Sequence, residues 1–318
     1  MAMQTTTLGK NGAPVTALGI GTWAWGDTLF WNYGKAYGAT QVEEAFNAAI
    51  AAGITFFDTA EVYGLGTSET LLGQFMQKNQ EISVDIATKY GPAPWRLFGN
   101  SVTDAVTASL KRLQVPSVTL YQVHWPFAFF MSQETLLNAL ADEVQQGRIK
   151  AIGVSNYSAA QMRESYEILK KRDIPLAVNQ VQYSLLHRKI ESNGALKTAK
   201  ELGITILAYS PLAQGLLTGK YTSKRKVKPD GARKIDSRFS DRGLEKIAPV
   251  TDLLQELSDR YDKTPSQISL NWLISQGDTV PIPGAKNAGQ AIDNAGALGW
   301  SLSAEDVAKL SEVSRPWL

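Results

Sequence analysis

Residues 55–63 read Thr-Phe-Phe-Asp-Thr-Ala-Glu-Val-Tyr, and this short stretch sets the pattern for the rest of the chain. Its apolar opening is typical of a buried strand, which places Asp58 near the strand end and Tyr63 a short turn later. A carboxylate at a strand tip with a tyrosine just beyond it presents polar groups to a pocket. The stretch therefore predicts a polar site, and the ends of other strands should supply its remaining side chains.

The same unit, a short apolar run followed by a helical stretch, recurs along the sequence. The expected strands are 17–21, 55–59, 85–89, 119–124, 151–155, 177–182, 205–209 and 279–283. The expected helices are 41–52, 68–78, 101–113, 133–146, 158–172, 192–202, 247–261, 265–275, 287–295 and 303–313. Strands that alternate with helices form parallel sheets, so eight such units predict an α/β fold, a (β/α)8 TIM barrel, in preference to a doubly wound sheet.

Two further elements flank the repeating units. Residues 4–17 predict an N-terminal β-hairpin that turns at 9–12, where Asn-Gly favours a tight turn. The stretch 303–313 predicts an extra C-terminal helix. Small residues predict the helix boundaries, with Ser68, Ser158 and Ser303 as N-caps and Gly53, Gly147 and Gly203 in the left-handed conformation after a helix.

Composition narrows the class of protein. The 318 residues suit one domain over 1–318, since such a barrel takes about 250 residues. With 32 basic and 30 acidic residues the chain is nearly neutral, so we expect no binding to nucleic acid or to an anionic membrane. The absence of cysteine excludes disulfides and thiolate catalysis, and 2 histidines exclude a multi-histidine metal centre. The first residues lack the regions of a signal peptide and no apolar run approaches ~20 residues, so we expect a cytoplasmic protein.

Residues 19–24 match the dinucleotide-binding pattern G-x-G-x-x-A. That pattern needs a helix directly after its second glycine, and residues 25–28, Trp-Gly-Asp-Thr, are not a helix start. We therefore reject a Rossmann fingerprint. The long irregular stretch 212–246 holds a basic cluster at 224–228, which is either a solvated loop or a lid that faces a phosphate.

The carboxyl ends of the strands hold the active site in a (β/α)8 barrel. The expected strand ends deliver Gly21-Thr22-Trp23, Asp58 with Tyr63, Lys89-Tyr90, His124-Trp125, Ser155-Asn156, Gln180, Tyr209-Ser210 and Gly284-Ala285-Lys286. Taken singly, each residue could have an ordinary structural role instead of a role in a site. An aspartate could cap a turn, a lysine could be solvated, and a histidine could be satisfied in the core. Taken together, they predict one polar rim.

Asp58, Tyr63, Lys89 and His124 are the candidate catalytic residues. Tyrosine is a general acid with an ordinary pKa of about 10, which the charge of a nearby lysine lowers. Asp58 would hold Lys89 charged and in place, and His124 would hydrogen-bond a substrate oxygen or relay the proton. A tyrosine acid suits the reduction of a small-molecule carbonyl substrate, for which a nicotinamide cofactor must supply the hydride.

The remaining strand tips fit that cofactor. Ser155, Asn156 and Gln180 have groups that hydrogen-bond a carboxamide, and Tyr209 could stack on its ring. Residues 210–220 offer small residues and backbone N–H groups for a pyrophosphate. Lys286 precedes a helix start, which is a natural anion site, so it would bind an extra phosphate and favour NADPH over NADH. Its alternative is an ordinary surface lysine.

These residues closely resemble the aldo-keto reductase family over essentially the whole chain. The resembling segments are Asp58-Thr-Ala-Glu-Val-Tyr63, Lys89 at its strand end, Gln122-Val-His124-Trp-Pro, Gly153-Val-Ser155-Asn156, Tyr209 to Lys220, and Ile282-Pro-Gly-Ala-Lys286 with Gln290 and Asn294. The resemblance implies a monomeric barrel that binds NADPH in extended form, with the four candidate residues as its catalytic tetrad. Residues 21–26 and 124–126 look like the plant plastid and cyanobacterial branch.

The strand tips and the resemblance together imply a set of cofactor contacts. The set is Gly21, Thr22, Trp23, Asp58, Ser155, Asn156, Gln180, Tyr209, Ser210, Pro211, Leu212, Gly215, Leu216, Lys220, Gly284, Lys286, Gln290 and Asn294. Many relatives have a basic residue where this chain has Gln290, so fewer charges should face a 2′-phosphate here.

A substrate pocket is expected to be walled by Trp23, Trp25, Tyr90, Trp125 and Phe127. Such walls suit an apolar or aromatic aldehyde, although tryptophans could merely seal the barrel mouth. Two other interpretations stay open. One is a cofactor-sensing regulatory subunit with slow turnover, as among channel-associated relatives of the family, and the other is a pyridoxal reductase.

Overall fold

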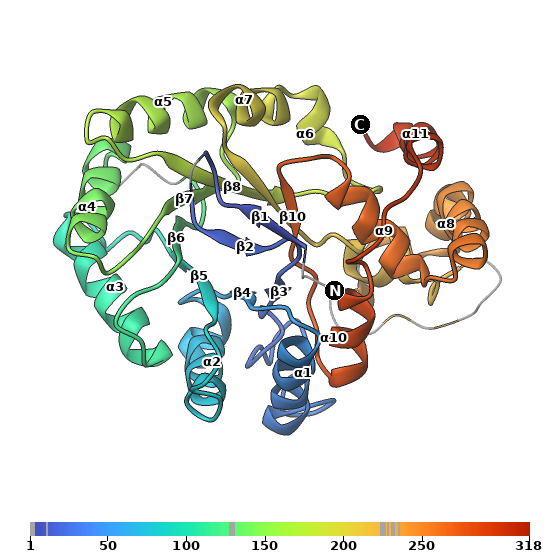
Figure 1. Cartoon of the computed structure of the whole chain (residues 1–318), viewed down its shortest axis with the longest axis horizontal. Helices are drawn as coiled ribbons and strands as arrows, with labels where there is room; N and C mark the ends of the chain where they lie inside the picture. The colour runs from blue at the N-terminus through green and yellow to red at the C-terminus, as the bar shows by residue number, and fades with distance from the viewer. Residues whose placement is uncertain are drawn as a thin grey trace.

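Parallel strands form one sheet in which each strand lies beside the next one in the chain. They are β3 (Ile20–Gly21), β4 (Phe56–Asp58), β5 (Asp85–Tyr90), β6 (Leu120–Val123), β7 (Ile152–Ser155), β8 (Leu176–Gln182), β9 (Thr205–Tyr209) and β10 (Thr279–Pro281). In this computed structural model the strands surround a common centre, and helices lie outside them (Figure 1). The structure describes residues 4–10, 12–126, 131–222, 227, 229, 233–234 and 236–318.

The sheet closes on itself where β3 meets the last strand. The backbone N–H of Gly19 donates to the carbonyl of Pro281 at 3.0 Å, and that of Gly21 donates to Pro283 at 3.0 Å. A Cβ atom at Gly21 would lie 2.8 Å from the carbonyl oxygen of Ile282, so this close approach requires a glycine. The predicted (β/α)8 barrel is thus confirmed, with the eight strands in the expected order.

Helices surround the barrel on its outer side (Figure 1). They are α1 (Ala39–Ala51), α2 (Thr67–Gln77), α3 (Asn100–Leu113), α4 (Gln133–Gln145), α5 (Ala159–Lys170), α6 (Lys189–Ser192), α7 (Ala195–Leu202), α8 (Asp241–Tyr261), α9 (Pro265–Ile274), α10 (Ala288–Ala295) and α11 (Ala304–Val313). Short 3₁₀ turns include η1 (Tyr63–Gly66), η2 (Ala213–Thr218), η4 (Ser237–Phe239) and η5 (Arg315–Trp317). None of the described helices is both long and apolar enough to cross a membrane.

The expected helices are confirmed with two differences. The helix expected at 247 begins earlier, at Asp241, because the Ser240 side chain accepts the N–H of Gly243 and caps it there. The helix expected over 192–202 is interrupted before α7 by Gly194, which has a left-handed φ of 85°. No described helix begins between the glycine pattern at 19–24 and α1, in agreement with the rejected Rossmann fingerprint.

Most predicted helix boundaries are also confirmed. The hydroxyl oxygens of Ser158 and Ser303 cap α5 and α11. Left-handed φ angles follow at Gly53 (85°), Gly147 (73°) and Gly203 (67°). The prediction for Ser68 was wrong, because α2 begins one residue earlier after the left-handed Gly66, and Ser68 is buried.

The N-terminal hairpin is confirmed and lies across one end of the barrel (Figure 1). Its strands β1 (Thr5–Thr7) and β2 (Pro14–Thr16) are antiparallel. Thr205 Oγ1, at the start of β9, donates to the carbonyl of Thr7 at 3.0 Å, so the hairpin covers the amino ends of the strands. Asn11 of the predicted turn lies outside the described residues.

Side chains from the hairpin fill this end of the barrel. Leu8 and Val15 are buried in one cluster with barrel residues that include Phe56, Val178 and Leu207. Because this cluster closes the amino end, the polar strand tips at the carboxyl end are the ones left to form a site.

We predict that Gly9 is needed for the fit of the hairpin. Gly9 has a φ of 71°, and a Cβ there would lie 2.8 Å from Ala177 Cα. Gly147 has a similar φ of 73° but nothing within 4 Å of a Cβ. Gly147→Ala should lower the free energy of unfolding by about 1 kcal/mol, from backbone strain alone. Gly9→Ala should lower the free energy of unfolding by about 1–3 kcal/mol more than Gly147→Ala does, because of the added clash. Urea unfolding measures both values. Equal losses would contradict the tight contact.

Candidate active site

The side chain of Lys89 lies inside the barrel near the end of β5 and is fully buried. Its Nζ atom donates to Asp58 Oδ1 at 2.6 Å, to the carbonyl of Thr59 at 2.7 Å and to Tyr63 Oη at 3.2 Å. Asp58 ends β4, and Tyr63 opens the η1 turn that follows it. The pairing of β4 with β5 therefore brings together three of the four predicted catalytic residues.

The charges in this cluster set the protonation of its members. Burial alone would lower the pKa of Lys89, but the Asp58 carboxylate and Tyr63 raise it above its ordinary value. Burial raises the pKa of Tyr63, and although Lys89 lowers it as predicted, the net shift is upward. At neutral pH Lys89 is therefore charged and Tyr63 keeps its proton, which is what a proton donor requires.

His124, the fourth predicted residue, follows β6 and packs against Tyr63. The two ring centroids are 5.6 Å apart, with the rings nearly perpendicular at 80°. Burial, with a smaller effect from the charge of Lys89, lowers the pKa of His124 to about 2. Its buried Nδ1 atom has no hydrogen-bond partner among the described residues, unlike a histidine satisfied in the core. His124 is thus a neutral imidazole beside the phenol.

A cavity of about 1380 Å³ lies at this end of the barrel, with Asp58, Tyr63 and His124 in its lining. Small-molecule sites usually enclose about 300–1000 Å³, so this one has room for more than one ligand. Many apolar lining side chains come from the segments after β3, β4 and β6, and they include Trp23, Leu29, Phe30, Trp31, Val62, Leu65 and Trp125. The basic lining residues and several polar ones follow β9 and β10, among them Lys220, Arg233, Lys286, Asn287, Gln290 and Asn294.

Most predicted cofactor residues line this cavity. They are Gly21, Trp23, Asp58, Ser155, Asn156, Gln180, Tyr209, Ser210, Pro211, Leu212, Gly215, Lys220, Gly284, Lys286, Gln290 and Asn294. The Tyr209 hydroxyl donates to Asn156 Oδ1 at 3.1 Å, which links the end of β9 to the residue after β7, across the intervening strand β8. Asn156 and Ser210 have left-handed φ angles of 62° and 50°. Such sparsely populated conformations in non-glycine residues gather at ligand sites.

Lys286 lies where basic and aromatic side chains of the cavity lining meet. Its Nζ atom is 4.4 Å from the ring centroid of Trp31, and the Arg233 guanidinium is 5.3 Å from the same centroid. These distances allow cation–π attraction. Gln290 Oε1 accepts the backbone N–H of Lys286 at 2.8 Å. Gln290 therefore shapes the turn before α10.

The sequence and the fold both resemble those of known proteins. Residues 17–315 match the family model described as the aldo/keto reductase family. The chain belongs to this family. It is therefore an oxidoreductase, as the resemblance of its motifs implied.

Individual aldo-keto reductases and related oxidoreductases align over most of their length. A chloroplastic pyridoxal reductase of Arabidopsis thaliana is 38% identical over 312 residues, which cover 95% of this chain and 84% of the relative. An aldo-keto reductase of Bacillus subtilis is 33% identical over 321 residues, 98% of this chain and 93% of the relative. A glycerol dehydrogenase of Gluconobacter oxydans has a TM-score of 0.84 at 28% identity, over 100% of this chain and 97% of that one. An aldo-keto reductase of Klebsiella pneumoniae in complex with NADPH has a TM-score of 0.75 at 27% identity, over 99% and 96%.

Four of the residues predicted to contact the cofactor or the substrate do not line the cavity of this aldo-keto reductase. Trp25, Tyr90 and Leu216 are buried in the main hydrophobic core, so the predictions of substrate or cofactor contact for them were wrong. Thr22 is also fully buried, and its hydroxyl donates to the carbonyl at the end of β4 instead of to a ligand. Phe127, predicted to wall the substrate pocket, lies outside the described residues, as does most of the basic cluster 224–228.

Sequence reasoning missed several residues of the site, of which two are informative. Gln122 on β6 is fully buried, and its Nε2 atom donates to Asp58 Oδ2 at 3.1 Å. A glutamine in an otherwise apolar strand was the available signal, because a buried amide needs a partner. Trp31, the second, comes from an irregular segment whose sequence has no periodicity to show where its side chains lie.

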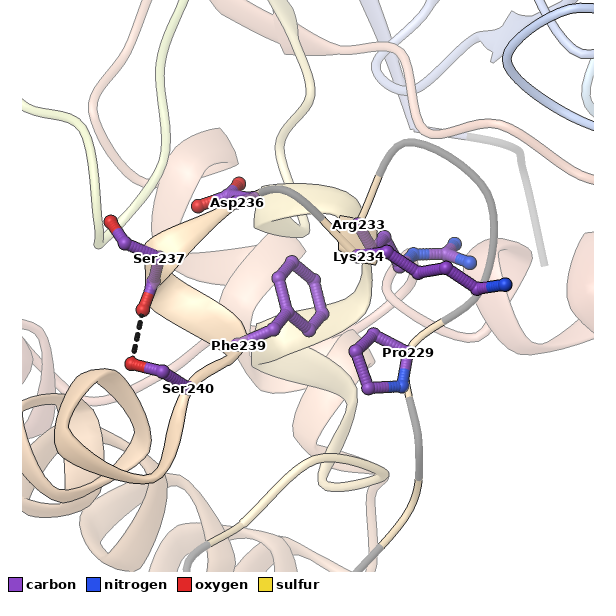
Figure 2. A pocket seen from close by; sticks show the side chains of 7 residues that line it. All are labelled: Pro229, Arg233, Lys234, Asp236, Ser237, Phe239 and Ser240. Carbon is purple, nitrogen blue, oxygen red and sulfur yellow. Dashed lines mark hydrogen bonds between the residues drawn. The ribbon is translucent and has the colours of Figure 1, made fainter.

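A smaller hollow of about 170 Å³ lies beside η4 and shares Arg233 with the large cavity (Figure 2). It is lined by Pro229, Arg233, Lys234, Asp236, Ser237, Phe239 and Ser240. The Ser240 hydroxyl donates to the carbonyl of Ser237 at 2.7 Å, so part of its polar lining is already satisfied. Its volume is too small for a dinucleotide, and it contains none of the tetrad.

We predict that burial of His124 makes folding sensitive to acid. Histidine in an unfolded chain has a pKa near 6.5, whereas the pKa of His124 in the folded protein is lowered to about 2. Below pH 6.5 the unfolded state binds the extra proton, so stability falls as pH falls, by about 1.4 kcal/mol per unit. Between pH 6.5 and about pH 5 the free energy of unfolding of the parent should therefore fall by about 2 kcal/mol more than that of His124→Gln. Urea unfolding at each pH measures the difference. Parallel pH profiles would contradict the neutral, buried imidazole.

Proposed function

We propose that this protein is an NADPH-dependent reductase that converts aldehydes and ketones to alcohols. The observation that carries the proposal is the phenol of Tyr63, which lines the cavity while a buried ion pair stands behind it. The NADPH complex of the Klebsiella relative supports the choice of cofactor. The small-molecule substrate, the monomeric state and the cytoplasmic location stay predictions.

The lining of the cavity fits the chemistry of NADPH. Lys220, Arg233 and Lys286 offer positive charge for phosphates. The helix α10 begins at the cavity, where Asn287 caps it, and a helix start favours anions. Asn156 and Gln180 offer amide groups for the carboxamide. When bound there, NADPH would supply the hydride that no side chain can provide.

Tyr63 would give its phenol proton to the carbonyl oxygen of the substrate. As hydride addition makes that oxygen negative, its affinity for a proton rises and the transfer becomes favourable. Lys89, 3.2 Å from the phenol oxygen, then stabilises the phenolate that remains, and Asp58 keeps Lys89 in place. His124, being neutral, can donate a hydrogen bond to the same carbonyl without competing as an acid.

The apolar side of the cavity supports an apolar or aromatic substrate. Trp23 packs against Tyr63 with ring centroids 6.3 Å apart and against Phe30 at 5.8 Å. Trp125 also lines the cavity, and its ring centroid is 4.4 Å from that of His124. An aldehyde whose remainder is a ring or a hydrocarbon would therefore bury that remainder beside the proton donor.

A second candidate is the reduction of pyridoxal, favoured by the 38% identity with the Arabidopsis enzyme. A panel that contains pyridoxal and 4-nitrobenzaldehyde, with NADPH consumption as the readout, separates the candidates. A higher kcat/KM for 4-nitrobenzaldehyde supports the general reductase, and a higher value for pyridoxal supports the second candidate. NADPH binding with very slow turnover of the whole panel would indicate a cofactor-sensing regulatory subunit instead.

We predict that Tyr63→Phe lowers kcat by about 10²-fold or more, because it removes the proton donor and leaves the ring in place. NADPH should still bind to the variant, as measured by calorimetry. Tyr33→Phe is the control, because Tyr33 packs against Tyr37 in the segment after β3 but does not line the cavity. Full turnover in Tyr63→Phe would refute the assigned role.

We predict that Lys286→Ala weakens NADPH binding by about 10- to 100-fold, since a charge-assisted hydrogen bond is lost. The affinity for NADH, which lacks the 2′-phosphate, should change by less than about threefold. Lys263→Ala is the matched control, because Lys263 also lies near an indole, that of Trp300 at 5.8 Å, but outside the cavity. If the parent binds both cofactors equally, Lys286 does not recognise the 2′-phosphate.

A further inference from the structure

The carboxylate of Asp58 has two oxygens with different partners. Oδ1 accepts from Lys89, whereas Oδ2 accepts from two amides, Gln180 Nε2 at 2.8 Å and Gln122 Nε2 at 3.1 Å. Gln180 Nε2 also donates to Gln122 Oε1 at 3.1 Å. Asp58, Gln122 and Gln180 thus form a closed triangle of hydrogen bonds in which every donor is an amide nitrogen.

The two glutamines differ in their access to the cavity. Gln180 on β8 lines it together with Asp58. Gln122 on β6 is fully buried and is not part of the lining. Gln122 can therefore influence a bound molecule only through the residues that it holds.

The triangle fixes which way the Gln180 amide faces. A primary amide has a nitrogen that only donates and an oxygen that only accepts. Gln180 uses its nitrogen on two acceptors in the barrel wall, Asp58 Oδ2 and Gln122 Oε1, so its oxygen is the atom left for the cavity. A reversed amide would place that oxygen against both acceptors, which is unfavourable in a buried site.

Gln122 contributes to this orientation in two ways. Its oxygen is one of the acceptors that the Gln180 nitrogen satisfies. Its nitrogen holds Asp58 Oδ2 in the position where Gln180 can reach it, while Lys89 holds the other oxygen. Because all three side chains of the triangle are at least nearly fully buried, water does not replace a lost partner easily.

We propose that Gln122 is a positioning residue that, through Gln180, sets the cavity to accept an N–H group from a bound carboxamide. The proposal rests on the proposed function, because it takes the nicotinamide of NADPH or NADP⁺ as the bound group. Gln122 thereby makes the site selective for a primary amide over a ketone of the same shape, without touching either.

The test compares NADP⁺ with its 3-acetylpyridine analogue, in which a methyl ketone replaces the carboxamide and no N–H group remains. Dissociation constants are measured by calorimetry for the whole chain. The parent should bind NADP⁺ more tightly than the analogue. Gln122→Met, which keeps the shape but has no amide, should reduce this preference by about 3- to 10-fold, mainly through weaker NADP⁺ binding.

Two controls separate positioning from a general loss of stability. Asn179→Leu removes another buried amide from β8, one that donates to the Tyr157 carbonyl and not to Asp58, so it should leave the preference unchanged. Adding Gln122→Met to a Gln180→Leu variant should also leave the preference unchanged, because Gln122 acts through Gln180. A further decrease in that background would overturn the proposal.

The outcomes distinguish this proposal from the function on which it rests. If the parent prefers NADP⁺ and Gln122→Met keeps the full preference, the positioning role is wrong and the reductase function stands. If the parent binds neither compound, the reductase function and this proposal are both wrong. Should Gln122→Met fail to fold, Gln122→Asn, which withdraws the amide by one methylene group, provides the same comparison.

Discussion

The site depends on one buried charge, the ammonium group of Lys89. Moving such a group out of water costs several kcal/mol, and only close partners offset that cost. Asp58 supplies the opposite charge at 2.6 Å, and the carbonyl of Thr59 supplies a second acceptor at 2.7 Å. These partners come from β4 and the residue after it, so the alignment of β4 with β5 decides whether the charge is tolerated. The same alignment brings Lys89 to the phenol of Tyr63, which faces the cavity.

The fold supplies this alignment and makes the two ends of the barrel different, since one is filled by a hydrophobic cluster and the other contains the cavity. Closure of β3 on the last strand fixes all strands relative to one another, so that polar side chains at successive strand ends converge. The hairpin fills the amino end with Leu8, Val15 and their neighbours, and it leaves the opposite end for chemistry. The hydrophobic cluster and the cavity thereby lie at opposite ends of one barrel, which is the usual arrangement in this architecture.

The strands could be predicted, and so could the clustering of Asp58, Tyr63, Lys89 and His124, because each strand is a short apolar run with a polar residue at its tip. The loops could not, since side-chain alternation holds along a strand but not through a turn. Trp23 and Trp25 show this, because they lie two residues apart, yet Trp23 lines the cavity and Trp25 joins the core. Tyr90 was a different error, since the residue after an inward-facing Lys89 on the same strand must face outward.

The tryptophans that line the cavity have an optical consequence. Of the 8 in the chain, Trp23, Trp31 and Trp125 contribute to this lining, and Trp31 has the Lys286 ammonium 4.4 Å from its ring. Indole emission responds to nearby charge and to contact with another ring system. A phosphate that draws Lys286 away from Trp31 would therefore change the light that the protein emits. Binding in the cavity should therefore be measurable from the fluorescence of the protein itself, including for molecules that it does not convert.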